Sequence, residues 1–384
     1  MEMKRPGTSL VTTLLRKARR EFMLTAFAVV LFAFALADPE LIGAYPGFVD
    51  WPTIHALAGL MIITTALEES GLFHHLARRI TALAGSQRGL ALLLVTAAAL
   101  LSMALTNDIA LFIMVPLSLA LGGKLHLDLG RLVIFEALAV NAGSTLTPIG
   151  NPQNLFLWHQ AGVSFFGFVY RMLPLELLLM GLLLGFTWLA FAPQPLRRRP
   201  GGREGPVRRL LFGAAAAAFV AFLVCIELGL AAWGLAGVAL LTLLLARRVL
   251  LRVDWALLIL FLLMFVDLHL LSLVPAVRGW LEGLGLADPR RLFVAGVAAS
   301  QVLSNVPAAM LLAKFTSRWD VLAFAVNLGG SGLVLGSLAN LIALRLAGQE
   351  AGGRRLWLRF HWYSVPFLLV SCAAAYAMFS LVGW

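Results

Sequence analysis

The chain has 384 residues, of which 61% are hydrophobic and only 13% are charged. Its mean hydropathy of +0.91 leaves too few polar residues to cover a water-soluble protein of this length. Composition therefore excludes a soluble globular domain and predicts a polytopic membrane protein. Its spanning segments must be helical, because backbone polar groups in lipid have to bond within their own segment.

The net charge of +11 does not indicate a nucleic-acid partner. The basic residues gather in short clusters between apolar runs and form no continuous basic face with interleaved aromatic residues. Such clusters are typical of cytoplasmic loops under the positive-inside rule. They lie at 4–20, 78–88, 197–209, 247–252 and 345–359.

A basic stretch, 1–20, precedes the first apolar run, which has no small-residue cleavage site before Asp38-Pro39. We expect a cytoplasmic N-terminus and a retained first helix in the cytoplasmic (inner) membrane. Cys225 and Cys372 each lie in an apolar segment, so the sequence predicts neither a disulfide framework nor a cysteine metal site. Continuous spans are predicted over 21–37, 52–70, 168–192, 210–230, 231–246, 253–274 and 360–383.

Two further apolar stretches, 89–121 and 292–313, are each cut near the middle by a polar tripeptide. We interpret both as re-entrant helical hairpins whose tip residues cap the second arm. The alternative is an ordinary polar turn at the membrane surface. With hairpins, the basic clusters fall on the cytoplasmic side, the first hairpin enters from inside and the second from outside. The tripeptides are Thr106-Asn107-Asp108 and Ser304-Asn305-Val306.

Two other apolar stretches, 131–160 and 319–346, contain interruptions that no continuous helix tolerates. In the first, two prolines remove backbone donors and disfavour helical geometry in the residues before them. A half-helix is predicted to restart there with Asn151 as N-cap and Pro152 at its first position. The second stretch is interrupted by glycines and restarts with Ser337 as N-cap.

One order of predicted segments occurs twice: a span, a hairpin, an interrupted span and a further span. It begins at Asp50-Trp51 and again at Asp254-Trp255. NAGSTLTPIGNPQNL, from Asn141 to Leu155, aligns with NLGGSGLVLGSLANL, from Asn327 to Leu341, at a constant offset of 186 positions (141 to 327). The predicted fold is an all-α polytopic membrane protein with two inverted-topology repeats, each with a re-entrant hairpin and a discontinuous transmembrane helix.

The domain organisation follows from this repeat. The first repeat covers 21–192, with its hairpin at about 89–121 and its broken helix at about 131–160. A basic cytoplasmic linker, 193–209, leads to 210–384, which holds a connecting helix and the second repeat, with its hairpin at about 292–313 and its broken helix at about 319–346.

Interrupted helices in corresponding positions of inverted repeats indicate a transporter site near the bilayer midplane. Unwound carbonyls, hydroxyls and amides offer oxygen ligands to a cation, and half-helix N-termini offer donors to an anion. The alternative is a pair of glycine-mediated helix contacts. The candidate ligands are Thr106, Asn107, Asp108, Asn141, Gly143, Ser144, Thr145, Thr147, Gly150, Asn151, Asn154, Ser304, Asn305, Asn327, Gly329, Gly330, Ser331, Ser337 and Asn340.

Asp108 is the charge of greatest interest, because a carboxylate at depth costs ~2.5 to 3.5 kcal/mol on insertion scales. It would hold sodium or carry a proton; alternatively, it only caps its hairpin arm near water. Asp267, His269 and Glu136 are secondary candidates. No other cofactor is predicted, and no catalytic residue, since no nucleophile with a base or metal-ligand cluster falls in one site. A sodium ion would be held by Asn107, Asp108, Asn141, Asn305 and Asn327.

At these motifs the chain resembles the ion transporter superfamily, which includes arsenite permeases, citrate permeases, divalent-anion/sodium symporters and related sodium/proton antiporters. The resemblance covers nearly the whole chain and is most specific in LTNDIALFIMVP (105–116), GSTLTPIGNPQNL (143–155), SNVPAAMLL (304–312) and GSLANL (336–341). The hairpin motifs are closest to the arsenite permeases. In the divalent-anion symporters both hairpins carry Ser-Asn-Thr, and both third-position threonines are missing here.

The resemblance implies a dimer-forming scaffold region, a mobile transport region that bears the hairpins and broken helices, and an elevator-like displacement. We expect a homodimeric secondary active transporter that moves a small anion or oxyacid and is coupled to protons or sodium. The alternatives are an arsenite or antimonite efflux permease and a sodium/proton antiporter of the same superfamily. A coupled cation fits the sequence, because an ionised Asp108 would repel a multivalent anion unless it were neutralised.

Overall fold

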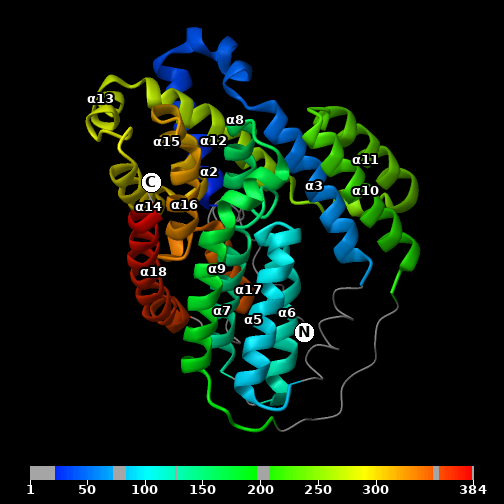
Figure 1. Ribbon diagram of the computed structural model, residues 1–384. Coiled ribbons are helices and arrows are strands. Elements are labelled where there is room, and N and C mark those ends of the chain that lie inside the picture. The colour runs from blue at the N-terminus through cyan, green and yellow to red at the C-terminus, as the bar shows by residue number, and fades with distance from the viewer. Residues whose placement is uncertain (1–21, 72–83, 126–127, 197–206, 349–353, 383–384) are drawn as a thin grey trace, which may run out of the picture.

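The computed structural model describes residues 22–71, 84–125, 128–196, 207–348 and 354–382, and within them the chain is helical without a named strand (Figure 1). The predicted all-α polytopic architecture is therefore confirmed. The basic N-terminus 1–20, the linker residues 197–206 and parts of two other basic clusters, 78–83 and 349–353, lie outside these residues.

The described residues of the first half of the chain form nine elements. They are α2 (Phe22–Ala37), η1 (Pro39–Phe48), α3 (Trp51–Glu69), α5 (Gln87–Ala104), α6 (Asn107–Leu125), α7 (Leu129–Gly143), α8 (Pro152–Ala161), α9 (Phe165–Ala190) and α10 (Arg209–Glu227).

The second half continues with α11 and ends with the long helix α18. Its elements are α11 (Ala231–Ala246), η2 (Val249–Leu251), α12 (Trp255–Leu273), α13 (Pro275–Gly283), α14 (Pro289–Leu303), α15 (Asn305–Leu312), η3 (Ala313–Phe315), α16 (Trp319–Gly330), η4 (Val334–Gly336), α17 (Leu338–Ala347) and α18 (Arg354–Val382).

Five helices among the described residues are long and apolar enough to cross a bilayer on their own: α5, α9, α10, α12 and α18. A sixth span forms if η1 and α3, which meet at a bend of 61°, are taken together. The polar interruptions lie between consecutive helices: α5 and α6, α7 and α8, α14 and α15, and α16 and α17. Of these helices, α8, α15 and α17 have only eight to ten residues.

Two Asp-Trp pairs begin α3 and α12 in the same way. Asp50 accepts a hydrogen bond from Thr53 N, and Asp254 accepts one from Leu257 N, so each carboxylate caps its helix. The following tryptophan donates its Nε1 hydrogen to a carbonyl five residues earlier, at 3.0 Å in α3 and 2.8 Å in α12. The similarity of the two halves therefore extends to side-chain contacts.

Glycines allow close approach of two helix pairs, α5 with α7 and α14 with α16. A Cβ at Gly143 would overlap the Ala99 carbonyl oxygen, and a Cβ at Gly329 would lie 2.5 Å from Ser300 Cβ. Only a residue without a side chain fits at either place. Helices α5 and α14, the predicted first arms of the hairpins, are thus packed tightly against α7 and α16, the helices that precede the two breaks.

Three local features are not among the sequence predictions. The 3₁₀ segment η1 precedes α3, and the short amphipathic helix α13 follows α12. The turn between α10 and α11 is narrow because Gly229 adopts φ 73°, a conformation that glycine reaches without strain. Neither η1 nor α13 was predicted, because the sequence predictions concern spanning helices and neither element is long enough to span the membrane.

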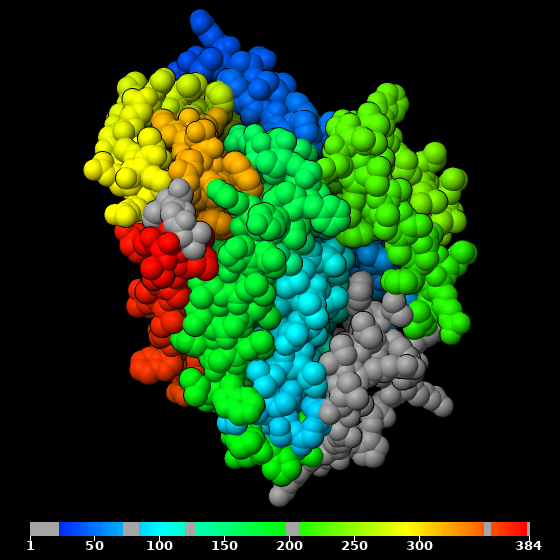
Figure 2. Space-filling view, in the orientation of Figure 1, coloured from blue at the N-terminus to red at the C-terminus, as the bar shows by residue number. Residues whose placement is uncertain are grey.

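Helices α10 and α11 pack against α3 and form a lobe beside the remaining helices (Figure 2). Large apolar side chains of this lobe, including Leu210, Trp233 and Leu244, are exposed, as expected for a surface in contact with lipid.

A charged cluster joins the start of α7 to α18. Arg359 Nη2 donates to Asp128 Oδ2 at 2.6 Å, and Arg131 N donates to Asp128 Oδ1 at 3.1 Å. Burial opposes ionisation of Asp128, but the hydrogen bonds and charges of the two arginines outweigh it and lower its pKa. The ion pair therefore fixes one end of α7 close to the outer helix α18.

Candidate functional site

The tips of the two hairpins place one asparagine each at the start of a second arm. Asn107 N donates to Gly150 O at 2.8 Å, which joins the first tip to the first helix break. Asn107 Oδ1 accepts from Asp108 N at 3.0 Å, and Asn305 Oδ1 accepts from Val306 N at 2.9 Å. Both amide oxygens thus turn back onto the next residue, and Asn305 Nδ2 is enclosed without a partner in the described structure.

The capping prediction is wrong for Ser304. Its hydroxyl makes no capping bond to α15, and its backbone has φ 79° and ψ 155°, a region that is essentially restricted to glycine. Such a conformation costs about 1 to 3 kcal/mol and concentrates at functional sites. Thr106, at the other tip, is buried and shows no positive φ.

Two asparagine pairs cross between the two helix breaks. Asn141 Nδ2 donates to Asn340 Oδ1 at 2.7 Å, and Asn327 Nδ2 donates to Asn154 Oδ1 at 2.7 Å. The 186-position offset relates Asn141 to Asn327 and Asn154 to Asn340. The second pair is therefore the equivalent of the first pair with the two halves of the chain exchanged. Each break therefore contributes one donor and one acceptor to the other.

The N-caps of the restarted helices reach across in the same manner. Asn151, the N-cap of α8, donates through Nδ2 to Asn327 Oδ1, and Ser337, the N-cap of α17, donates through Oγ to Asn141 Oδ1, both at 2.9 Å. Each also caps its own helix, by accepting from Asn154 N and Ala339 N respectively. The prediction of Asn151 and Ser337 as N-caps is confirmed.

Asn154 and Asn340 also bond to the carbonyls that unwinding leaves free. Asn154 Nδ2 donates to the carbonyls of Ser144, Thr145 and Thr147 at 3.1 to 3.2 Å. Asn340 Nδ2 donates to the carbonyls of Gly330, at 2.9 Å, and Leu333, at 3.2 Å. Because buried backbone acceptors need partners, these two side chains stabilise the two open loops.

The remaining predicted residues lie in the same region but face other partners. The hydroxyls of Ser144 and Thr145 donate to Asn141 O, each at 3.1 Å. Thr147 Oγ1 donates to Met103 O, in the first hairpin arm, at 2.6 Å. Ser331 is fully buried, and its hydroxyl has no partner within the described ranges.

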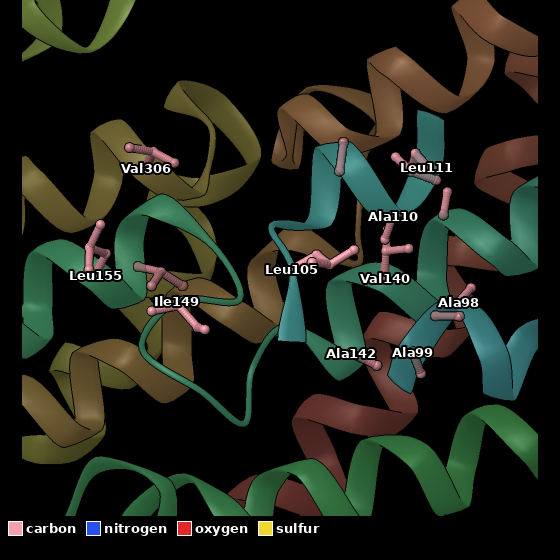
Figure 3. Close-up of a cluster of buried hydrophobic side chains, with 14 of the residues drawn as sticks. Ala98, Ala99, Leu105, Ala110, Leu111, Val140, Ala142, Ile149, Leu155 and Val306 are labelled. Carbon is pink, nitrogen blue, oxygen red and sulfur yellow. The ribbon is translucent and has the colours of Figure 1, made fainter. Parts of the chain in front are cut away.

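Buried apolar side chains from the elements that carry these polar residues form a cluster (Figure 3). Ile149 and Leu155, from the first break and α8, lie on the side of Val306, while Leu105 and Val140 lie on the side of the first hairpin. All of them are buried. In such surroundings hydrogen bonds are strong and unpaired polar groups are costly, so the network specifies one geometry.

Asp108 is buried at the first hairpin tip, within electrostatic reach of Asp254 at the start of α12. The secondary candidates stand apart from the asparagine network. Ser118 Oγ donates to Glu136 Oε1 at 2.5 Å, and both oxygens of Asp267 are buried without a partner in the part of the chain described. His269 stacks on Phe48 with ring centroids 4.0 Å apart.

The four asparagines expected to hold sodium each use their amide oxygen already. Asn141 and Asn327 accept from an N-cap side chain, and Asn107 and Asn305 accept from a backbone N–H. An amide oxygen has two lone pairs, so Asn107 and Asn141 each keep one for a cation. Asn327 and Asn305 each accept a second, longer hydrogen bond at 3.4 Å, from Gln153 Nε2 and Ser304 Oγ respectively.

Two glutamines are absent from the sequence prediction. Gln153, beside Asn154, is buried and reaches Asn327 Oδ1 with its Nε2 at 3.4 Å, while its Oε1 has no partner among the described residues. Gln301, four residues before Asn305, makes two hydrogen bonds around the second break, with Gly329 O and Leu333 N, and one with Val297 O of its own helix. For Gln301 the available signal was a polar residue within an apolar arm, and for Gln153 it was the neighbouring Asn154.

A sequence model of the family described as citrate transporter matches residues 10–318, which is most of the chain. The chain belongs to this family. Like its relatives in this family, it is a membrane transporter and not an enzyme.

Three relatives illustrate the range of proteins to which the chain is similar. Inner membrane protein YbiR of Escherichia coli is 44% identical over 87% of this chain and 89% of its own length. An uncharacterized transporter of Methanocaldococcus jannaschii is 32% identical over 80% of this chain and 84% of its own. A silicon efflux transporter of Oryza sativa is 31% identical over 42% of this chain and 32% of its own.

Proposed function

We propose that this protein is a secondary active transporter of the cytoplasmic membrane that moves a small oxyacid or anion, coupled to protons or sodium. The crossed asparagine pairs Asn141–Asn340 and Asn327–Asn154 carry this proposal. They place amide groups where two half-helices meet, deep among spanning helices, and a buried polar network of this kind marks a transport site.

Inverted repeats with re-entrant hairpins account for the arrangement of the helices. In Figure 1, α5, α6 and α7 occupy the lower half of the molecule, whereas α15, α16 and α8 occupy the upper half. Hydrogen bonds at the breaks recur at the same 186-position offset, for example from Asn141 to Ala137 O and from Asn327 to Ala323 O. An N-terminus in the cytoplasm follows from the basic clusters.

An elevator-like displacement would separate two groups of helices. The first comprises α2, α3, α10, α11 and α12, and the second comprises the hairpins, the broken helices, α9 and α18. Among the described residues, the contacts between them include Thr53 Oγ1 at 3.0 Å from His159 Nδ1, Lys314 Nζ at 2.8 Å from His269 Nδ1, and Phe156 packed edge-on against Phe265. Phe165 N, at the start of α9, also donates to Glu227 Oε2, at the end of α10, at 3.0 Å. A homodimer would form through the first group.

The donors and acceptors favour a small oxyacid over a tricarboxylate. The crossed asparagines bond to asparagines, glutamine, serine and backbone carbonyls in the described structure, and no arginine or lysine is among these partners. The hydroxyl groups of a neutral oxyacid, such as arsenous or silicic acid, both donate and accept hydrogen bonds, so amides match them without needing a counter-charge. The printed name of the Oryza sativa relative, a silicon efflux transporter, agrees with this class.

The coupling ion would act through Asp108, the acidic residue of the hairpin tips. A proton or a sodium ion there removes the charge that would otherwise oppose burial and repel an anion. A sodium/proton antiporter is the second candidate, because the same carboxylate would then carry both ions in turn. Movement of labelled oxyacid, rather than of protons or sodium alone, distinguishes the two.

Thermal-shift measurements in detergent test the proposal. Sodium, lithium and pH are crossed with arsenite, silicate, phosphate, sulfate, citrate and succinate. At least one oxyacid should raise the melting temperature of the wild type but not of Asn107→Ala or Asn305→Ala. Ser371→Ala, which removes a buried hydroxyl of α18 outside the site, should respond like the wild type. If every ligand shifts all four proteins equally, the proposed site is wrong.

A further inference from the structure

Gln301 inserts its carboxamide into the second helix break from the first arm of the second hairpin. Its Nε2 donates to Gly329 O at 2.8 Å and to Val297 O at 3.0 Å. Its Oε1 accepts from Leu333 N at 2.8 Å. One side chain of α14 thus pairs backbone groups on both sides of the unwound residue Ser331.

The glycines of this break accommodate Gln301. A Cβ at Gly332 would overlap Gln301 Oε1 and would lie 2.7 Å from Leu368 Cδ2; a Cβ at Gly336 would lie 3.3 Å from the same Oε1. Leu368 ends in a flexible methyl group that can shift, whereas the Gln301 oxygen is held by a hydrogen bond. Gly332 is therefore a glycine chiefly because the carboxamide fills its side-chain space.

The first repeat joins the same two positions with different chemistry. Met103, which also precedes its tip asparagine by four residues, occupies the place of Gln301, and Thr147 occupies the place of Leu333. There the hydroxyl of Thr147 donates to the carbonyl of Met103 at 2.6 Å. In one repeat the break supplies the side chain, and in the other the hairpin supplies it.

We propose that Gln301 is the positioning residue of the second break: it fixes the spacing of Gly329 and Leu333, and so aims Gly330, Ser331 and Asn340 at the ligand. Gln301 itself does not touch the ligand. It also links hairpin α14–α15 to α16 and α17, so that tip and break move as one unit. The part of this inference that concerns the ligand rests on the proposed function.

We call the three hydrogen bonds of the Gln301 side chain the Gln301 clamp. Hydrogen–deuterium exchange of the full chain in detergent tests this clamp without any ligand. Gln301→Met removes three hydrogen bonds at similar volume, so the amides of Gly332 and Gly336 should exchange about tenfold faster or more. The peptide 143–154 of the first break should not change. Exchange within about twofold of the wild type in the second break would overturn the inference.

A double variant that copies the arrangement of the first repeat should rescue the Gln301→Met defect. Gln301→Met with Leu333→Thr recreates the Met103 and Thr147 pair, and the amide exchange of the second break should return to near the wild-type rate. The matched control is Gln301→Met with Leu335→Thr, because Leu335 lies in the same break and is also exposed. Equal rescue by both threonines would contradict a specific clamp.

Transport kinetics separate positioning from simple stability. With arsenite and silicate as probes in proteoliposomes, Gln301→Met should raise the half-saturating concentration about tenfold, and Leu333→Thr should reverse this. An unchanged half-saturating concentration despite faster exchange would overturn the positioning role. If neither probe binds the wild type, the proposed function fails, while the exchange result still decides the clamp.

Discussion

The first helix break, 144–151, and the second, 331–337, hold the same asparagines in place by different means. The first contains two threonines and Pro148, and its own residue Thr147 bonds to Met103 O of the preceding helix α5. The second is rich in glycine and depends on Gln301 from the neighbouring hairpin. The crossed asparagine pairs are common to both. This difference teaches that the amide geometry is the shared requirement, while the support of each loop is free to vary.

The largest effect is expected from removing one crossed asparagine. Asn327→Leu leaves Asn154 Oδ1 without its partner in a buried site, at a cost of about 1 to 3 kcal/mol, and removes one of the hydrogen bonds of Asn151 Nδ2, which still donates to Ser144. Unfolding in mixed micelles should show a loss of about 3 kcal/mol, and transport should be lost. Asn141→Leu should match it, since Asn340 and Ser337 lose the same contacts. A large difference between the two variants would contradict the symmetry.

Substitution of the packing glycines Gly143 and Gly329 by alanine should give the next largest loss of stability, and the loss should differ between the two positions. Gly143→Ala pushes a Cβ into the backbone of Ala99, whereas Gly329→Ala meets the side chain of Ser300. Overpacking costs about 1 to 3 kcal/mol, and the rigid backbone should place Gly143→Ala at the upper end.

Denaturation in mixed micelles measures both glycine variants. Adding Ser300→Gly should recover most of the stability of Gly329→Ala, and no side-chain change should recover Gly143→Ala. Gly181→Ala is the control, because a Cβ there meets nothing within 4 Å. Equal rescue at both positions would show that the two helix contacts are equivalent.

A smaller effect is expected from Thr147→Val, which keeps the shape of the side chain and removes its hydrogen bond to Met103 O. The unfolding free energy should fall by about 1 kcal/mol. Thr145→Val, whose hydroxyl bonds, among the described residues, only to Asn141 O at the end of the adjacent helix α7, is the matched control and should change less. Exchange of the first-break amides should accelerate in Thr147→Val only.

The smallest effect should differ in sign between the hairpin tips. Ser304→Gly relieves a backbone at φ 79° and should raise the unfolding free energy by about 1 kcal/mol. Thr106→Gly relieves no positive φ and should lower it by about 0.5 to 1 kcal/mol. Two variants that change stability in the same direction would show that the tips do not differ in strain.

Much of the site was predictable from the sequence because polar residues are rare in this chain. All seven asparagines lie at a tip or a break, and each is buried. Prolines and glycines in apolar helices showed where the helices end, and Asn151 and Ser337 are N-caps as predicted. Local signals of this kind depend only on neighbours in the chain.

The partners of these residues were not predictable. That Asn141 pairs with Asn340, and Asn327 with Asn154, depends on how α7, α8, α16 and α17 pack across the molecule. The strained backbone of Ser304 and the clamp of Gln301 also result from tertiary packing. A single sequence carries no local signal for contacts between residues so far apart.

The most direct test of the central claim is oxyacid flux into proteoliposomes that contain wild type, Asn107→Ala, Asn305→Ala or Ser371→Ala. The two tip asparagines make few internal bonds, so both variants should fold and reconstitute normally. The account predicts that their arsenite or silicate flux falls to the background of empty liposomes, while Ser371→Ala keeps the wild-type rate. Wild-type flux in both asparagine variants would contradict it.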